Sequence, residues 1–224
     1  MIIGSVSENK DLEKRVAITP DIIKKYKSLG MEICLSKDYA IHLGILDDEY
    51  KKEGVTILDN DEKVIMKSDA ILQMNMLSEE NLNKLKKDQF LIGVLNAYLN
   101  ENKLKELNSK KVNCFSLELL PRITRAQSMD ILSSQANLAG YKAVVDSFAY
   151  FKKAIPMMMT AAGTISAAKV LVVGAGVAGL QAIATAKRMG AIVFATDVRL
   201  ASKEQVESLG GKFLTVQGSE NLET

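Results

Sequence analysis

Short apolar segments alternate with charged segments along the first two thirds of the chain. Apolar runs of about four to eight residues, bounded by polar or turn-forming residues, are typical of buried strands. The charged segments between them carry apolar residues at helical spacing and predict helices. We therefore expect an α/β fold in which a mainly parallel sheet is covered on both faces. The predicted strands are 1–6, 31–36, 70–75, 90–95 and 112–119, and the predicted helices are 19–30, 78–88 and 100–111.

A change of composition after Pro156 divides the chain. The segment PRITRAQ (121–127) is predicted to be a loop, and a long helix without proline is predicted over 128–153. Beyond it the chain is rich in Met, Ala and Gly, and we expect the methionines at 157–159 to pack in a core or a hinge. The predicted division is an N-terminal domain over 1–127, a linking helix over 128–156 and a second domain over 157–224.

The charge balance and the cysteine content exclude several classes of protein. The chain has 29 Lys and Arg residues against 27 Asp and Glu residues and one His, a net charge of +2, so no surface for nucleic acid is expected. Cys34 and Cys114 are too few for a disulfide scaffold or a zinc site, and we expect reduced thiols in a cytoplasmic protein that holds no metal. The 47% hydrophobic content argues against disorder.

One long apolar segment has the low charge of a membrane helix. From 154 to 186 the only charged residue is Lys169. Proline and glycine residues interrupt this segment, and KVLVV (169–173) is rich in β-branched residues. We therefore interpret it as a buried strand flanked by packed helix ends, and we expect no membrane span.

The second region has the pattern of a dinucleotide-binding unit. The strand predicted over 169–173 is followed at once by a Gly-x-Gly-x-x-Gly turn and a predicted helix, and a second strand over 192–196 ends at an acidic residue. An acidic residue roughly 20 positions beyond such a turn makes the signal strong. The candidate cofactor-binding residues are Gly174, Ala175, Gly176, Val177, Ala178, Gly179, Asp197 and Val198.

Each of these residue types has a physical reason at its position. Gly174 allows the tight turn, Gly176 lets the backbone approach a pyrophosphate, and Gly179 lets helix and strand pack closely. The helix N-terminus offers free N–H groups to the phosphates. Asp197 would accept hydrogen bonds from the ribose hydroxyls and repel a 2′-phosphate, which favours NAD over NADP. Arg199 could meet a 2′-phosphate, but we expect a solvated side chain.

Five segments complete a longer pattern: PRITRAQSMDILSSQANLAGYKAV, PMMMTAAGT, GAGVAGLQAIATAKRMGA, ATDVR and KEQVESLGGKF. Together they resemble the NAD-binding component (alpha subunit, domain I) of proton-translocating NAD(P) transhydrogenases. The resemblance spans nearly the whole chain and is specific from 122 to 213. The earlier stretch KRVAITPDIIKKYKSLGMEI is less specific, because it also resembles alanine dehydrogenase, a relative with the same two-domain plan.

This resemblance implies an enzyme component, its cofactor and its partners. The component would bind NADH and pass hydride directly to NADP held on a separate domain, and a membrane domain would couple this transfer to proton translocation. It would be a cytoplasmic homodimer, peripheral to the inner membrane through its partner subunits. By the same resemblance Arg122, Asp130 and Ser133 would hold the nicotinamide carboxamide, and Gln127 would reach toward the partner's NADP. The residues alone also allow a purely structural interpretation, in which Arg122 forms a salt bridge within the loop and Asp130 is an acidic residue at a helix N-terminus.

A chemical argument separates the two relatives. Oxidising an amino acid requires a base for the N–H proton and a cation for the carboxylate. Alanine dehydrogenases resemble this chain at Arg15, but their lysine and histidine correspond here to Asn75 and Asn96. We expect His42 in a structural or exposed loop position. Hydride transfer between two nicotinamides needs positioning and exclusion of water rather than acid–base groups, so it suits these residues better.

The second domain is predicted to contain only the first half of a doubly wound fold. Its strands would be 169–173, 192–196 and 212–216, which leaves the first of them as an apolar edge. We therefore interpret the chain as the N-terminal part of the family's component, and two alternatives stay open. One is an alanine-dehydrogenase-like amino-acid oxidoreductase, and the other is a catalytically inert NAD-binding fragment. We expect the chain to hold the ADP half of NADH but to hold its nicotinamide poorly.

Overall fold

The computed structural model describes residues 1–215 and divides the chain into two compact units. The first unit comprises Met1–Met129, and the second begins at Asp130. Each unit has its own sheet and its own buried core.

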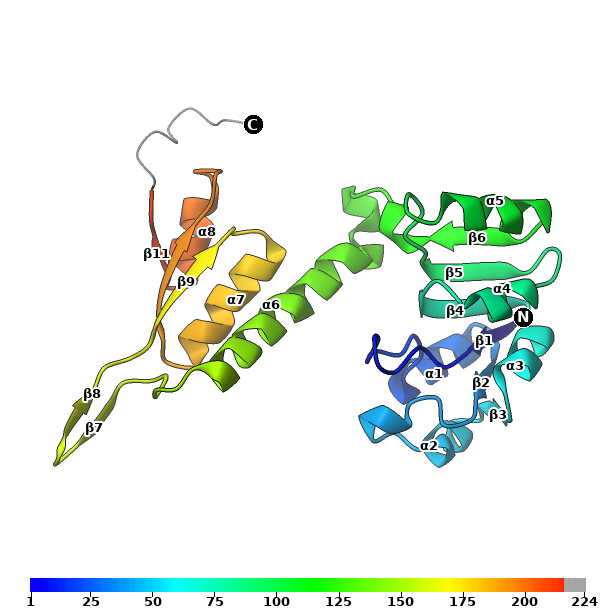
Figure 1. Cartoon of the computed structure of the whole chain (residues 1–224), viewed down its shortest axis with the longest axis horizontal. Helices are drawn as coiled ribbons and strands as arrows, with labels where there is room; N and C mark the ends of the chain where they lie inside the picture. Colours follow the sequence, from blue (N-terminus) through cyan, green and yellow to red (C-terminus); the bar gives the residue numbers. More distant parts are fainter. Residues whose placement is uncertain (216–224) are drawn as a thin grey trace. The chain divides into compact units, whose positions relative to one another are not determined.

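The first unit is built on a six-stranded parallel sheet (Figure 1). The strand order is β3-β2-β1-β4-β5-β6, so the chain moves outward from β1 in one direction, returns, and moves outward from β4 in the other. This reversal places a topological switch point between the carboxyl ends of β1 and β4. The strands are β1 (Ile2–Ser5), β2 (Glu32–Ser36), β3 (Thr56–Leu58), β4 (Ala70–Asn75), β5 (Phe90–Val94) and β6 (Asn113–Ser116).

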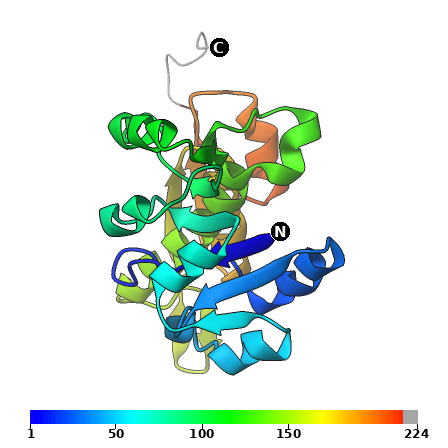
Figure 2. The ribbon, with the colours of Figure 1, turned by 90° about the vertical axis from the view of Figure 1, so that its right-hand side faces the viewer.

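Helices cover both faces of this sheet (Figure 2). Each face has a separate apolar core. Side chains of α1 and of the α2 region pack on one face, and side chains of α3, α4 and α5 pack on the other. The helices are α1 (Pro20–Ser28), α2 (Asp47–Lys52), α3 (Asp61–Lys67), α4 (Glu79–Asn83) and α5 (Glu101–Ser109), with short 3-10 turns η1 (Ile41–Leu43), η2 (Leu117–Leu119) and η3 (Thr124–Met129).

The predicted α/β class with parallel sheets is confirmed, but the elements between 37 and 69 were not predicted. β3 is three residues long and follows a helix of six residues, so neither shows a clear period in the sequence. The predicted helix 78–88 ends earlier, at Asn83. The buried side chain of Gln89 accepts a hydrogen bond from the Lys86 N–H at 2.9 Å and fixes a turn there, which ends the helical hydrogen bonding.

The second unit packs a long helix, α6 (Ile131–Tyr150), on α7 (Val177–Arg188) beside a three-stranded parallel sheet of order β11-β10-β9. A Cβ at Gly140 of α6 would lie 2.1 Å from the carbonyl oxygen of Ala178, so the two helix backbones touch where no side chain intervenes. The predicted linking helix over 128–156 corresponds to α6, which begins directly after the division between the units and packs on α7. The remaining elements are β9 (Lys169–Val173), β10 (Ile192–Thr196), α8 (Ser202–Ser208) and β11 (Lys212–Phe213).

The predicted strand 212–216 is seen only as β11, and position 216 lies outside the described residues. The other two predicted strands of this unit have the bounds of β9 and β10. Within residues 1–215, β9 forms one edge of the three-stranded sheet.

A hairpin precedes this sheet, formed by β7 (Met158–Thr160) and β8 (Gly163–Ile165) (Figure 1). Its strands pair antiparallel and all six of their residues are exposed. The expectation that the methionines at 157–159 pack in a core or hinge is therefore wrong, because all three side chains are exposed, those of Met158 and Met159 on β7. None of the helices in residues 1–215 combines the length and apolar character that crossing a bilayer requires.

We predict that Gly140→Ala destabilises the second unit. The added methyl group would meet the Ala178 carbonyl at 2.1 Å, so α6 and α7 must move apart, at a cost of about 1–3 kcal/mol. Urea unfolding measures the change, and Ser134→Ala, at an exposed position of the same helix, is the control. Equal stability of Gly140→Ala and the parent chain would show that the helices tolerate a wider separation.

Candidate functional site

The glycine-rich turn joins β9 to α7 at the carboxyl end of the second unit's sheet. Gly174 has a φ of +95°, a left-handed conformation that favours glycine. Its N–H donates to the carbonyl of Thr196 at 2.8 Å, which ties the turn to the end of β10. Gly176 is the N-cap residue of α7, and its carbonyl accepts the first intrahelical hydrogen bond from Leu180 at 2.9 Å. The first turn of α7 therefore begins directly beyond the ends of both strands.

The other two glycines of the turn differ in what surrounds them. A Cβ at Gly176 would meet no atom within 4 Å in the described structure, so this side of the turn is open. A Cβ at Gly179 would lie 1.8 Å from the Gly174 carbonyl oxygen and 3.6 Å from a Val172 methyl group. Gly176 thus leaves space for a ligand near the backbone, whereas Gly179 is required for α7 to pack against the turn.

The N-terminus of α7 keeps its partial positive charge for a ligand. Among the described residues, no side chain caps this end and no acidic residue stands in its first turn. The backbone N–H groups of the first turn, over 177–179, are donors that a helix cannot satisfy internally. Such an end, above an open space, is suited to a phosphate group.

Asp197 follows β10 and is almost fully buried, with 7% of its side chain exposed. Its Oδ2 accepts a hydrogen bond from the Ala175 N–H at 2.6 Å, and its Oδ1 accepts one from the Arg199 N–H at 2.8 Å. The hydrogen bonds from the Arg199 side chain, followed by these backbone N–H groups, hold the pKa of Asp197 well below its usual range. The carboxylate is therefore ionised at neutral pH, and it joins the glycine turn to the end of the next strand.

Arg199 is paired, whereas a solvated side chain was expected. Its Nε donates to Asp197 Oδ1 at 3.0 Å and its Nη2 donates to Asp197 Oδ2 at 3.2 Å, which is the two-pronged geometry of a guanidinium on a carboxylate. The guanidinium side chain remains 52% exposed, so it lies over the carboxylate at the surface. Val198, between them, is exposed.

The four residues taken from the loop resemblance lie on both sides of the division between the units. Arg122 and Gln127 are exposed in the first unit, before and within η3. Asp130 caps α6, because its Oδ1 accepts from the Ser133 N–H at 2.9 Å and its Oδ2 accepts from the Ser133 hydroxyl at 2.7 Å. The structure thus brings Asp130 and Ser133 together as a helix cap, and the roles of all four toward a nicotinamide stay predictions.

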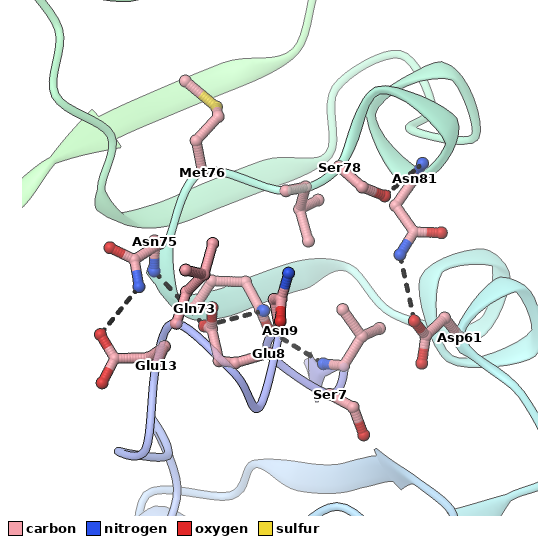
Figure 3. Close-up of a pocket in the computed structure, with 13 residues that line it drawn as sticks. Ser7, Glu8, Asn9, Glu13, Asp61, Gln73, Asn75, Met76, Ser78 and Asn81 are labelled. Atoms are coloured by element: carbon pink, nitrogen blue, oxygen red, sulfur yellow. Dashed lines mark hydrogen bonds between the residues drawn. The ribbon is translucent and has the colours of Figure 1, made fainter.

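A cavity of about 590 Å³ lies at the switch point of the first unit (Figure 3). Glu8 lines it, and its Oε1 accepts hydrogen bonds from the Gln73 amide at 3.1 Å and from the Met74 N–H at 2.7 Å. Burial raises the pKa of Glu8, against the lowering effect of these bonds. The cavity is lined by Val6, Ser7, Glu8, Asn9, Leu12, Glu13, Asp61, Gln73, Asn75, Met76, Leu77, Ser78 and Asn81.

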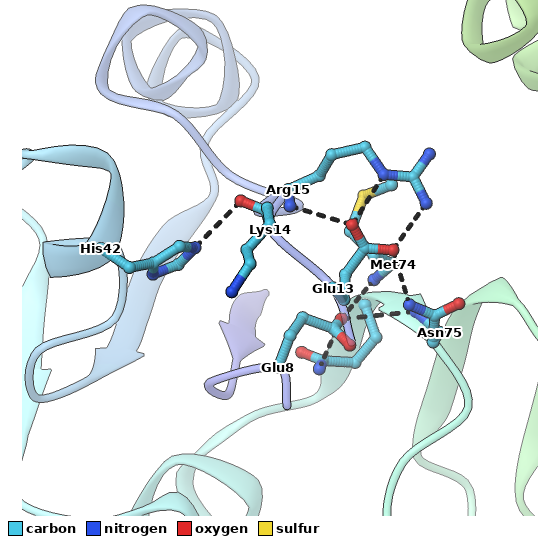
Figure 4. A network of polar contacts seen from close by, with 8 residues as sticks. Glu8, Glu13, Lys14, Arg15, His42, Met74 and Asn75 are labelled. Atoms are coloured by element: carbon cyan, nitrogen blue, oxygen red, sulfur yellow. Dashed lines mark hydrogen bonds and ion pairs between the residues drawn. The ribbon is translucent and has the colours of Figure 1, made fainter. Parts of the chain in front are cut away.

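Glu13 and Arg15 form an ion pair beside this cavity (Figure 4). The Arg15 Nε donates to Glu13 Oε1 at 2.8 Å and its Nη2 donates to Glu13 Oε2 at 2.6 Å. The Asn75 amide donates to the same Oε2 at 2.9 Å. The hydrogen bonds from Arg15 lower the pKa of Glu13 to about 2, although burial opposes them. Neither Glu8 nor Glu13 was predicted from the sequence, because no local motif marks them.

The described lining of this cavity contains neither lysine nor histidine. Asn75 donates its amide to Glu13, and Asn96 lies in a turn with a φ of +49°. His42 lies apart on η1, where its Nε2 is 2.9 Å from the Lys14 carbonyl oxygen and its buried Nδ1 has no protein partner among the described residues. The ionisable side chains of the described lining are therefore all carboxylates, and none of them is a cation that could hold the carboxylate of an amino acid. Elsewhere in residues 1–215, no cluster of His, Cys, Asp and Glu could hold a metal ion.

Comparison with known proteins identifies two matching families and several relatives. The alanine dehydrogenase/PNT N-terminal domain matches 4–139, and the alanine dehydrogenase/PNT C-terminal domain matches 143–224. One relative is the first part of NAD(P) transhydrogenase subunit alpha from Rhodospirillum rubrum. It is 48% identical to this chain, and the match covers 96% of this chain and 58% of the relative. The corresponding protein of Rickettsia prowazekii is 45% identical over 100% of this chain and 59% of its own length. The chain thus spans less than two thirds of these relatives.

A solved structure shows the same fold. The transhydrogenase of Sinorhizobium meliloti superposes with a TM-score of 0.92 at 45% identity, covering 98% of this chain and 63% of that one. An L-alanine dehydrogenase superposes with a TM-score of 0.81 at 18% identity, covering 97% of this chain and 61% of that one, which is a likeness of fold alone.

We predict that Gly179→Ala destabilises the second unit and that Gly176→Ala does not. The first methyl group would lie 1.8 Å from a backbone oxygen, whereas the second would meet nothing within 4 Å. We expect a loss of about 1–3 kcal/mol for Gly179→Ala and less than about 1 kcal/mol for Gly176→Ala. Thermal unfolding followed by circular dichroism compares the two variants. Equal losses would contradict the different packing of the two positions.

We predict that the Glu13–Arg15 pair makes stability depend on pH. The unfolded chain protonates Glu13 near its ordinary pKa of 4.5, whereas the folded protein does so only near 2. The stabilisation is therefore complete above pH 4.5 and is lost as the pH falls toward 2. Glu13→Gln should lower the free energy of unfolding at pH 7 by about 1–3 kcal/mol, and the deficit should shrink as the pH approaches 2.

Urea titrations at a series of pH values measure this dependence. The control is Glu106→Gln, which makes the same substitution at an exposed carboxylate of α5. Its free energy of unfolding should equal that of the parent chain at every pH. A deficit of Glu13→Gln that stays constant from neutral pH down to the acid end of the series would exclude this origin.

Proposed function

This chain belongs to the alanine dehydrogenase/PNT family, and we propose on that basis that it is the NAD(H)-binding component of an NAD(P) transhydrogenase. Relatives at 45–48% identity carry the name of a transhydrogenase alpha subunit, whereas an alanine dehydrogenase of Methanococcus maripaludis is 25% identical. The first group therefore supports transhydrogenation over the oxidation of an amino acid.

The observation that carries the NAD(H) site is the position of Asp197 beside the glycine turn. Gly176 leaves open space at the start of α7, and Asp197 is bonded to the turn through Ala175 at 2.6 Å. A pyrophosphate would be held over Gly176 by the first N–H groups of α7, and the adenosine ribose would be held by the Asp197 carboxylate. The negative charge of Asp197 opposes a 2′-phosphate, so the site favours NAD(H) over NADP(H).

Bound NADH would supply the hydride, which moves to the nicotinamide ring of NADP⁺ on a partner domain and leaves NAD⁺ and NADPH. The residues of this chain would position that ring and exclude water, and no proton is added or removed at the reacting carbons. Arg122, Asp130 and Ser133 would hold the carboxamide, and Gln127 would reach toward the partner's NADP. The exposed position of Gln127 on η3 supports the last role.

The partners are an NADP-binding domain and a membrane domain that couples hydride transfer to proton translocation. The chain would then be cytoplasmic and peripheral to the inner membrane through these subunits. A homodimer is the proposed state, and the exposed apolar side chains of the β7–β8 hairpin support a contact with a second copy. The names of the relatives, which describe one piece of an alpha subunit, support an assembly with further subunits.

The alternatives differ in what they require. An amino-acid oxidoreductase would need a base for the N–H proton and a cation for the carboxylate of its substrate, and the described lining of the first unit's cavity offers carboxylates, amides and hydroxyls but no cation. A catalytically inert NAD-binding fragment would bind NADH and dock its partner without transfer. An assay of hydride transfer from NADH to an NADP⁺ analogue, with an NADP-binding transhydrogenase component added, separates these possibilities. Hydride transfer that depends on both proteins supports the proposal. NADH oxidation that depends on pyruvate and ammonia would instead identify an amino-acid oxidoreductase, and NADH binding without transfer would identify an inert fragment.

We predict that Asp197→Asn weakens the binding of NADH about tenfold or more, because hydrogen bonds to a charged acceptor are lost. The preference for NADH over NADPH should fall as well, since the repulsion of a 2′-phosphate disappears. Calorimetric titration of the 224-residue chain with each nucleotide measures both effects. Glu207→Gln, at an exposed position of α8, is the control. Unchanged affinity for NADH in Asp197→Asn would place the ribose elsewhere.

A further inference from the structure

The carboxylate of Asp197 is fully occupied by donors from its own chain. Its Oδ1 accepts from the Arg199 N–H at 2.8 Å and from the Arg199 Nε at 3.0 Å. Its Oδ2 accepts from the Ala175 N–H at 2.6 Å and from the Arg199 Nη2 at 3.2 Å. A carboxylate offers about four acceptor positions. The described donors therefore fill the positions that a ribose hydroxyl would need.

Only the guanidinium among these donors is free to leave. The Ala175 N–H belongs to a buried residue of the glycine turn, and this turn is itself tied to Thr196 by a hydrogen bond of 2.8 Å. The Arg199 N–H is part of the backbone directly after β10. The guanidinium, in contrast, ends a long side chain that is 52% exposed, so it can turn into water at little desolvation cost.

The guanidinium occupies as many acceptor positions on the carboxylate as a vicinal diol would need. Its Nε and Nη2 hold one site on each carboxylate oxygen. The 2′- and 3′-hydroxyls of an adenosine ribose also donate two hydrogen bonds to such a carboxylate. When the guanidinium moves away, the two backbone N–H groups keep the carboxylate oriented, and one acceptor position on each oxygen becomes available.

We infer that Arg199 is a specificity-determining residue whose guanidinium competes with the ribose diol for Asp197. This inference rests on the proposed NAD(H) site. The displaced guanidinium stays beside the ribose, because the Arg199 backbone remains bonded to Asp197 at 2.8 Å. There it can pair with a 2′-phosphate, which a guanidinium binds by charge-assisted hydrogen bonds. Arg199 therefore weakens the binding of NADH, strengthens the binding of NADPH, and reduces the discrimination that Asp197 alone would produce.

The test is a calorimetric titration of the 224-residue chain and its Arg199→Ala variant with NADH and with NADPH, at one fixed ionic strength. Arg199→Ala should bind NADH about two- to fivefold more tightly, since an exposed ion pair no longer has to be broken. The same variant should bind NADPH about tenfold more weakly, because the partner of the 2′-phosphate is gone. The control is Arg188→Ala, which removes an equal charge at an exposed position at the end of α7. It should neither tighten the binding of NADH nor weaken the binding of NADPH in this way.

Opposite shifts for the two nucleotides are the decisive result, because a structural role would weaken both. NADH binding that is unchanged or weaker in Arg199→Ala, with NADH bound by the parent chain, would overturn the inference and leave the proposed site intact. Weaker binding of both nucleotides to Arg188→Ala, to the same extent as to Arg199→Ala, would assign the effect to net charge and also overturn it. Absence of NADH binding in all three proteins would overturn the proposed NAD(H) site together with the inference.

Discussion

Backbone packed directly on backbone holds the second unit together. α7 approaches the turn that precedes it so closely that a single methyl group at Gly179 would overlap the Gly174 carbonyl. At the neighbouring residue Ala178, α6 approaches the same helix, and a methyl group at Gly140 would overlap the Ala178 carbonyl. These two contacts set the position of the N-terminus of α7. The open space over Gly176, and therefore the whole candidate nucleotide site, depends on that position.

Asp197 combines a structural and a ligand-binding role. Its carboxylate bonds to the Ala175 N–H and so fastens the glycine turn to the end of β10. The same carboxylate is the group to which a ribose would bind, and in the present structure it is covered by Arg199. A carboxylate that is ionised, buried and already oriented by two backbone N–H groups requires little rearrangement when the guanidinium leaves. The cost of binding is thus confined to one exposed side chain.

The first unit has a polar cavity at the topological switch point of its sheet. Its strand order places a cavity at the carboxyl ends of β1 and β4, where ligands of doubly wound sheets commonly lie. Acidic and amide groups line this cavity, and Arg15 is held by Glu13 at its side. The fold is shared with an L-alanine dehydrogenase, but the described lining holds no cationic side chain that could bind the carboxylate of an amino acid.

Local residue patterns were enough to predict the class of fold, the bounds of β4, β9 and β10, and the glycine turn with its acidic partner. Period-2 and period-3.6 patterns and glycine spacing depend on neighbouring residues alone, so they can be recognised along the chain. The same patterns did not predict the short elements between 37 and 69, the packing of α6 on α7, or the exposure of the hairpin methionines. The contacts of Arg199 with Asp197 and of Asn75 with Glu13 became visible only in the folded chain. Both contacts depend on where the backbone segments lie and on which rotamers the side chains adopt. A pattern of residue types along the chain predicts neither the placement of the segments nor the rotamers.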